Sequence, residues 1–272
     1  MTISKVAING LTFRIKREGS EKSPLLVFSN SLMSTLESWD LVSEKFLERG
    51  YQLLRYDQIG HGQSSQPSED SGYSLEDMTK QLHEIIVKAV GDVKPYAIIG
   101  DSIGGIIALR YAMLFSDQVD RIVACSVPGM ATIPATIDVW KERISTAESG
   151  GLKTQLAPST IERWFMPSDR SIISQELRDK MTASAQKTST AGYLTCARAL
   201  TNYDFRSDLG NIPNKTLLVA GKLDGNLPDV MKDFGAKIPH AKLHIMEKSG
   251  HIPMVDNPTE FFDVVFGFLK SS

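Results

Sequence analysis

Cysteine is scarce in this sequence: its 272 residues include only Cys125 and Cys196, which stand far apart. Two isolated thiols form neither a disulfide framework nor the paired spacing of a metal site. No apolar run is long enough to span a membrane, and the first residues, Met1–Lys5, lack the apolar core of a signal peptide. We therefore expect reduced thiols, no metal, no membrane association and a cytoplasmic location.

Neither positively nor negatively charged residues are in clear excess. The formal net charge is −2 and the basic residues do not cluster, which argues against nucleic acid as a partner. Apolar residues make up 42% of the chain and charged residues 23%, as is usual for globular proteins. The length suits one large α/β domain or two small ones, and we find no repeat or low-complexity stretch.

Short apolar runs alternate with helical patterns along much of the chain. After a hairpin signal at Asn9-Gly10, each run has the character of a buried parallel strand. The runs lie at residues 25–29, 51–57, 96–99, 121–127, 215–221 and 242–246. This order predicts an α/β fold with a doubly wound, mostly parallel sheet.

The pattern changes between residues 130 and 209, where no strand-like run occurs. Helical patterns there cover Ile137–Glu148, Pro158–Phe165, Ser174–Thr188 and Ala191–Asn202. We predict that residues 130–209, inserted after the strand near Val127, form a helical cap. Residues 1–129 and 210–272 would form the core. The cap would cover the C-terminal edge of the sheet, where ligands bind in open α/β folds.

Residues 100–105, Gly-Asp-Ser-Ile-Gly-Gly, lie between an apolar strand and an apolar helical stretch. This is the setting of a G-x-S-x-G nucleophile elbow, in which a sharp turn lifts the serine oxygen above the sheet. Gly100 and Gly104 would avoid the collisions that side chains cause beside such a turn. Ser102 is therefore the candidate nucleophile. Free N–H groups at the start of its helix favour negative charge nearby.

A serine nucleophile needs a base, and an acid that holds the base in one tautomer. Asp224 follows a late apolar strand, and His251 lies in a glycine-flanked loop after the next one. The order Ser, Asp, His matches this kind of fold. Because parallel strand ends meet at one edge, we predict a triad of Ser102, Asp224 and His251. The other candidate acids and bases lie outside such loops: Asp204, Asp208, Asp229, His83, His240 and His244.

Two backbone N–H groups are candidates for an oxyanion hole. Leu32 follows the strand at residues 25–29, and Ile103 follows the nucleophile. His61 lies in a glycine-rich turn, and we interpret it as a residue that satisfies backbone groups.

Smaller signals concern helix starts and one histidine. Ser38 precedes a helical stretch and is expected to cap it. Ser74 and Asp77 form a capping box at the start of another helix. His83 lies off the apolar stripe of that helix, so we expect it to face solvent.

Several stretches together carry a family resemblance. They are Ser29-Asn30-Ser31-Leu32 before Trp39, Arg55-Tyr56-Asp57 before Gly60-His61-Gly62, residues 100–105, Glu162-Arg163-Trp164-Phe165-Met166-Pro167 and Gly192-Tyr193-Leu194-Thr195-Cys196. The chain resembles the α/β hydrolases and, through the last two stretches, the 3-oxoadipate enol-lactonases. The resemblance implies the same triad and oxyanion donors.

Met33-Ser34 stand where that family often has Gly-Thr, and Ile59 stands where many members have arginine. We expect Met33, at the pocket mouth, to affect which substrate fits.

These observations predict a serine hydrolase that cleaves a lactone or carboxylic ester through an acyl-enzyme, without a cofactor. The resemblance points to a substrate like 3-oxoadipate enol-lactone. Two alternatives keep the fold and triad: a cofactor-free perhydrolase and a carbon–carbon bond hydrolase. A third, of another class, is a receptor that binds a ligand without turnover. The sequence does not predict an oligomeric state.

The expected substrate carries a free carboxylate, and arginine suits planar carboxylate recognition. Among the cap arginines we choose Arg143, which lies one helical turn from Trp140 on the same face. Trp164 would form a second wall, and Ser31 and Met33 complete the predicted pocket. The remaining cap arginines are Arg163, Arg170, Arg178 and Arg198.

Overall fold

The computed structural model describes residues 1–68, 72–165 and 173–271. Within them lies an eight-stranded sheet with the order β1-β2-β4-β3-β5-β6-β7-β8. The strands are β1 (Thr2–Ile8), β2 (Leu11–Glu18), β3 (Leu25–Ser29), β4 (Gln52–Tyr56), β5 (Ala97–Asp101), β6 (Arg121–Cys125), β7 (Lys215–Gly221) and β8 (Ala241–Met246). Strand β2 is antiparallel to β1 and β4, and all other neighbours are parallel. The prediction of a mostly parallel, doubly wound sheet is confirmed.

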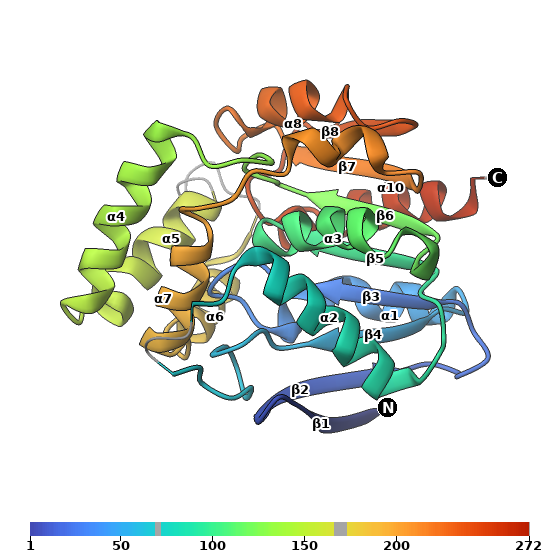
Figure 1. The fold of residues 1–272 in the computed structure, drawn as a ribbon, viewed down its shortest axis with the longest axis horizontal. Coiled ribbons are helices and arrows are strands. Elements are labelled where there is room, and N and C mark those ends of the chain that lie inside the picture. The colour runs from blue at the N-terminus through green and yellow to red at the C-terminus, as the bar shows by residue number, and fades with distance from the viewer. Residues whose placement is uncertain (69–71, 166–172, 272) are drawn as a thin grey trace.

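Helices cover both faces of this sheet (Figure 1). Helix α2 (Leu75–Val90) contacts α3 (Ile103–Leu114), and α1 (Asp40–Glu48) contacts α10 (Pro258–Lys270). Helix α8 (Leu227–Gly235) packs on β7 and β8. Helix α3 is apolar on all sides because it lies against the sheet and under α2, and nearly all of its residues are buried.

Within the described residues, four α-helices lie between β6 and β7 in the sequence. They are α4 (Pro134–Glu148), α5 (Ala157–Trp164), α6 (Gln175–Ala185) and α7 (Thr190–Ala199), with a turn of π-helix, η3 (Leu152–Leu156), before α5. Figure 1 shows them gathered at one end of the strands. Helix α4 begins three residues before the predicted start, because Pro134 suits the first helical position. That residues 130–209 form a domain of their own stays a prediction.

Two short sequence motifs correctly predicted the local backbone conformation. Asn9 and Gly10 both have positive φ, 50° and 82°, in the turn between β1 and β2. The hydroxyl of Ser74 accepts a hydrogen bond from the N–H of Asp77, which completes the capping box of α2. These two predictions are confirmed.

Two predictions about single side chains were wrong. Ser38 does not cap α1, because the 3-10 helix η1 (Leu36–Trp39) precedes that helix and the Ser38 hydroxyl donates to the carbonyl of Thr35. His83 is half-buried and packs against neighbouring side chains, whereas the sequence predicted a ring that faces solvent. Its ring stacks on Phe115 with centroids 4.3 Å apart, and Nδ1 lies 3.0 Å from the Tyr111 hydroxyl.

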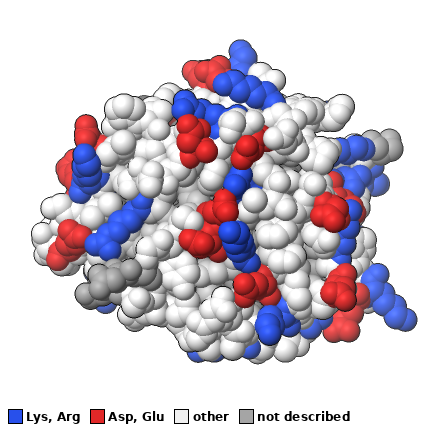
Figure 2. All heavy atoms as spheres, viewed as in Figure 1, with Lys and Arg blue, Asp and Glu red and all other residues white. Residues whose placement is uncertain are grey.

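Basic and acidic side chains alternate over the face of the molecule drawn in Figure 2, so neither sign dominates it. Both cysteines are buried and unpaired. Among the described residues, no helix is both long and apolar enough to cross a membrane. In that same part of the chain, no three acidic, histidine or cysteine side chains come together as metal ligands.

Candidate active site

Ser102 stands at a strained turn between β5 and α3. Its φ of 55° and ψ of −116° are rare for a residue with a side chain, and such strain is typical of functional sites. A Cβ at Gly100 would collide with the carbonyl of Gly104, and a Cβ at Gly104 would collide with the carbonyl of Ser29. The two glycines therefore allow the close backbone approach that this turn requires.

Asp224 and His251 come together from the loops after β7 and β8. Their atoms Oδ2 and Nδ1 lie 2.7 Å apart, and both side chains are buried. Burial lowers the pKa of His251, and the charge of Asp224 opposes this change; the nearby cation of Arg163 lowers the pKa further. The imidazole is therefore neutral near pH 7, with Nδ1–H directed at the carboxylate and Nε2 free to accept a proton.

Trp164 and Asp256 hold the loop that carries His251. The backbone N–H of His251 donates to the carbonyl of Trp164 at 3.0 Å, and their rings stack with centroids 6.1 Å apart. The carboxyl of Asp256 accepts a hydrogen bond from Gly250 N–H at 2.6 Å. Helix α5 thus fixes the orientation of the histidine through Trp164, its last residue.

The N–H groups of Leu32 and Ile103 donate no hydrogen bond within the described part of the chain. The neighbouring N–H of Met33 is already used, because it donates to Nε2 of His61 at 3.0 Å. His61 is fully buried, which lowers its pKa to about 4, and its Nδ1 lies 2.9 Å from the carbonyl of Ile59. His61 is therefore a neutral residue that shapes the loop and leaves the Leu32 donor free.

This arrangement of strands, elbow and late histidine invites comparison with known proteins. A sequence model described as the Alpha/beta hydrolase family matches residues 26–264. The chain belongs to this family. It is 28% identical to 3-oxoadipate enol-lactonase 1 of Acinetobacter baylyi over 263 residues, which cover 96% of this chain and 94% of the relative.

Two solved structures are also similar to the structure of this α/β hydrolase. A hydrolase from Pseudomonas aeruginosa PA01 is 26% identical, with a TM-score of 0.90 and coverage of 99% of this chain and 98% of the other. The enol-lactonase from Burkholderia xenovorans LB400 has the same TM-score of 0.90 at 24% identity, and 98% of this chain and 100% of that one are covered. At that identity the second likeness concerns the fold alone.

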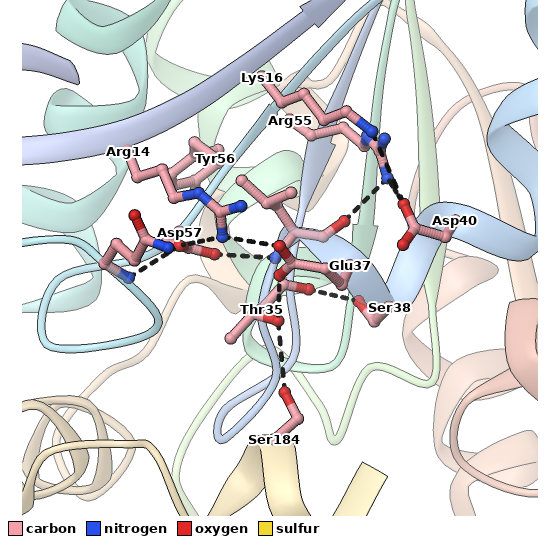
Figure 3. A network of polar contacts seen from close by, with 12 residues as sticks. Arg14, Lys16, Thr35, Glu37, Ser38, Asp40, Arg55, Tyr56, Asp57 and Ser184 are labelled. Atoms are coloured by element: carbon pink, nitrogen blue, oxygen red, sulfur yellow. Dashed lines mark hydrogen bonds and ion pairs between the residues drawn. The ribbon is translucent and has the colours of Figure 1, made fainter. Parts of the chain in front are cut away.

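A buried polar network holds the loop after β3 in this hydrolase (Figure 3). Asp57 accepts hydrogen bonds from the N–H groups of Leu36 and Gln63, at 2.9 and 3.0 Å. Arg14 bridges Asp57 and Glu37, at 3.3 and 2.7 Å. These contacts fix the backbone at Leu36 and Glu37, in the loop that also carries Leu32, so an oxyanion hole in this loop would be preorganised.

A cavity of about 500 Å³ lies above Ser102, between the sheet and the helices that follow β6. Its walls include all the predicted pocket and catalytic side chains: Ser31, Leu32, Met33, Ser102, Trp140, Arg143, Trp164, Asp224 and His251. Trp164 therefore both lines the cavity and holds His251. The catalytic and binding roles of these residues stay predictions, but the fold brings the side chains to one place.

Arg143 is held in the cavity wall by neutral partners. Its Nε donates to the hydroxyl of Tyr193 at 3.0 Å, and one terminal nitrogen donates to Thr160 at 2.6 Å. The Trp140 ring lies 5.8 Å from the guanidinium carbon, in cation–π range. No carboxylate of the described residues pairs with this guanidinium, so its charge is available to a ligand.

Arg163 is a charged residue of the cavity lining that the sequence analysis did not select. It makes no hydrogen bond or ion pair within the described residues, and it is accessible to solvent although protein surrounds it. Partial desolvation in the cavity lowers its pKa, as does the charge of Arg143, while Asp224 opposes the change. The spacing of Thr160, Arg163 and Trp164 on one face of α5 was the signal that could have identified it.

Arg178 and Arg198 do not line this cavity. Arg198 pairs with Glu148 at 2.8 Å on the surface, and Arg178 reaches the carbonyl of Phe165 at 3.4 Å. Arg170, like Met166 and Pro167 of the cap motif, lies outside the described residues. The rival acids are also elsewhere: Asp204 pairs with Arg206 and Asp208 with Arg110.

Proposed function

We propose that this α/β hydrolase is a serine hydrolase that cleaves a lactone or carboxylic ester through an acyl-enzyme. The observation that carries the proposal is one cavity that contains a serine at a strained elbow and a histidine hydrogen-bonded to an aspartate. The unpaired N–H groups of Leu32 and Ile103 add the donors that acyl transfer requires.

In the proposed mechanism, Nε2 of His251 takes the proton of Ser102 as its Oγ attacks the substrate carbonyl. The N–H groups of Leu32 and Ile103 stabilise the oxyanion of the tetrahedral intermediate. As the ring C–O bond breaks, the imidazolium returns the proton to the leaving oxygen. A lactone thus gives an open-chain acyl-enzyme. His251 then deprotonates a water molecule, which cleaves the ester bond to Ser102 and releases the acid. This sequence of steps uses no cofactor.

For the substrate, we propose a lactone that carries a free carboxylate, like 3-oxoadipate enol-lactone. The enol-lactonase relatives support this choice. So do Arg143 and Arg163, two guanidinium groups in the cavity wall that have no acidic partner among the described residues. Two cations in a partly desolvated site would attract an anionic substrate. Trp140 and Trp164 supply apolar walls for the ring.

A substrate panel tests the proposal. Purified protein is assayed with enol-lactones, simple lactones, activated esters, peroxide-dependent oxidation and a vinylogous diketone. We expect lactone or ester hydrolysis that Ser102→Ala lowers on the order of 10⁶-fold with the fold intact. Ser126→Ala is the matched control, because Ser126 also has positive φ at a strand end but lies outside the cavity.

Three outcomes would contradict the proposal. Retention of more than a few per cent of the activity in Ser102→Ala would exclude this nucleophile. Turnover of the diketone or of peroxide in preference to every ester would favour the carbon–carbon or perhydrolase alternatives. Binding without turnover of any substrate would favour a receptor.

A further inference from the structure

A second cavity adjoins the catalytic one. It has a volume of about 390 Å³ and lies between α6 and the segment that leads from the oxyanion loop into α1. Its lining combines apolar side chains, among them Leu177, Met181 and Val255, with charged ones, among them Arg14, Lys180 and Lys187. Figure 3 shows part of this region, where Thr35 faces Ser184 of α6. Met33 is the one described residue that lines both cavities.

The Met33 side chain lies between the two cavities and is packed against its neighbours. It is only 1% exposed. Its backbone N–H donates to His61, and its sulfur lies 3.8 Å from the hydroxyl of Thr160, which in turn accepts from Arg143. The wall between the two cavities is therefore the Met33 side chain, which these contacts fix in place.

The backbone at this wall is strained. Met33 has a φ of 67°, a conformation that costs little for glycine but is unfavourable for a residue with a long side chain. Such strain persists where the surrounding structure imposes it, often at functional sites. Here the strained residue is the one that lines both cavities.

We propose that Met33 is a specificity-determining residue: it closes the catalytic cavity against the second one and restricts the enzyme to short substrates. The inference rests on the proposed function, ester or lactone hydrolysis at Ser102. The second cavity would accept an unbranched alkyl chain of an ester along the apolar part of its wall, which Leu177, Met181 and Val255 form. Without the Met33 side chain, a chain that begins at the catalytic serine would extend into it.

The test compares long and short substrates within each variant. Met33→Gly removes the wall and suits the positive φ, whereas Met33→Leu keeps most of the volume. We measure kcat/KM for p-nitrophenyl butanoate and octanoate, and for butyl and octyl acetate, because the long chain could lie on the acyl or the alcohol side. The long-to-short ratio is the readout. A disturbed oxyanion hole would lower both rates alike and leave that ratio unchanged.

In Met33→Gly we expect the ratio to rise at least tenfold in one of the two series, and in Met33→Leu to stay within about twofold of wild type. A second substitution, Ala183→Trp, places a large side chain at the α6 side of the second cavity, where Ala183 belongs to the lining, and outside the catalytic cavity. Added to Met33→Gly, it should abolish the gain. An unchanged ratio in Met33→Gly would overturn the proposal. So would a gain that Ala183→Trp does not reduce, because the extra room would then lie elsewhere.

Failure of the proposed function would be seen separately, as absence of turnover by the wild-type protein. The inference is then tested by calorimetric binding of octanoate and butanoate. We expect Met33→Gly to raise the octanoate-to-butanoate affinity ratio at least tenfold, and Ala183→Trp to reverse this rise. Equal ratios in wild type and Met33→Gly would overturn it.

Discussion

Oδ2 of Asp224 lies 2.7 Å from Nδ1 of His251, across two loops that follow neighbouring parallel strands. This hydrogen bond selects the imidazole tautomer with a proton on Nδ1. Nε2 is then the atom that can accept a proton at the cavity. The bond is buried, so water does not compete for either partner.

We expect Asp224→Asn to lower kcat by about 10⁴-fold with little change in thermal stability. An asparagine amide can donate to Nδ1, which would place the imidazole proton on Nε2 and remove the base. Steady-state kinetics and thermal unfolding measure the two effects. Asp229→Asn, in the adjacent helix α8, is the matched control. If Asp204→Asn or Asp208→Asn lowers kcat more than Asp224→Asn does, the acid has been assigned wrongly.

The acid limb of the pH–rate profile should depend on Arg163. Burial, and to a lesser extent the Arg163 charge, lowers the pKa of His251. In the proposed mechanism the neutral imidazole is the active form, so kcat/KM should fall only below the ordinary histidine pKa of about 6.5. Arg163→Met removes a cation that disfavours the imidazolium, so this limb should move to higher pH.

Arg198→Met controls for the loss of one positive charge, because Arg198 lies on the surface and pairs with Glu148. Its pH profile should match that of wild type. An Arg163→Met profile that stays in place or moves to lower pH would show that this guanidinium does not act on His251.

The sequence was sufficient to place the candidate site because its residues follow strand ends. The apolar runs at β5, β7 and β8 were recognisable, although only Met246 of the edge strand β8 is buried. Parallel strands bring their C-terminal ends to one edge. Ser102, Asp224 and His251 could thus be grouped without any tertiary information. Leu32 could be selected because the loop after β3 reaches the same edge.

Tertiary contacts explain what the sequence did not show. The stacking of His83 on Phe115 depends on how α2 packs against the end of α3, which no local pattern encodes. The sequence analysis selected Arg143 for its spacing to Trp140 and missed Arg163, because the place of Arg163 in the cavity wall depends on how α5 packs against the rest of the fold. The second cavity beside Met33 depends on the packing of α6 against the segment at residues 33–41.

Asp256 should make the folded protein less stable as pH rises. Burial raises the pKa of its carboxyl to about 7, with the Asp224 charge adding to this and the Gly250 N–H opposing it. An unfolded aspartate titrates near 3.9. The folded state therefore binds the proton more tightly. The stability that this group contributes is present below pH 4 and lost as pH rises through about 7.

Asp256→Asn should consequently raise the free energy of unfolding at pH 8 by about 1–3 kcal/mol, because the amide stays neutral and its oxygen can still accept from Gly250. Denaturant unfolding at pH 5 and pH 8 measures the change. Asp263→Asn, exposed on α10, should have no such effect. A variant that is no more stable than wild type at pH 8 would contradict the assignment of Asp256 as a buried acid with a raised pKa.

The last prediction concerns the carboxylate of the proposed substrate. Arg143 and Arg163 line the cavity above Ser102, and neither pairs with an acid among the described residues. A charge-assisted hydrogen bond contributes about 1.5–3 kcal/mol, so Arg143→Ala or Arg163→Met should raise KM for a carboxylated lactone about 10- to 100-fold. For the same lactone with its carboxylate replaced by a primary amide, KM should stay within about twofold.

Comparing the two variants separates recognition from packing. Arg143 also holds Tyr193 and Thr160, so its truncation removes structural contacts, whereas Arg163 has no such partners in the described residues. If charge recognition is the role of these side chains, both variants should discriminate between the acid and the amide. Equal effects on both lactones in Arg143→Ala, with no effect in Arg163→Met, would instead make Arg143 a structural part of the wall. No effect of either variant on the carboxylated lactone would place its carboxylate elsewhere in the cavity.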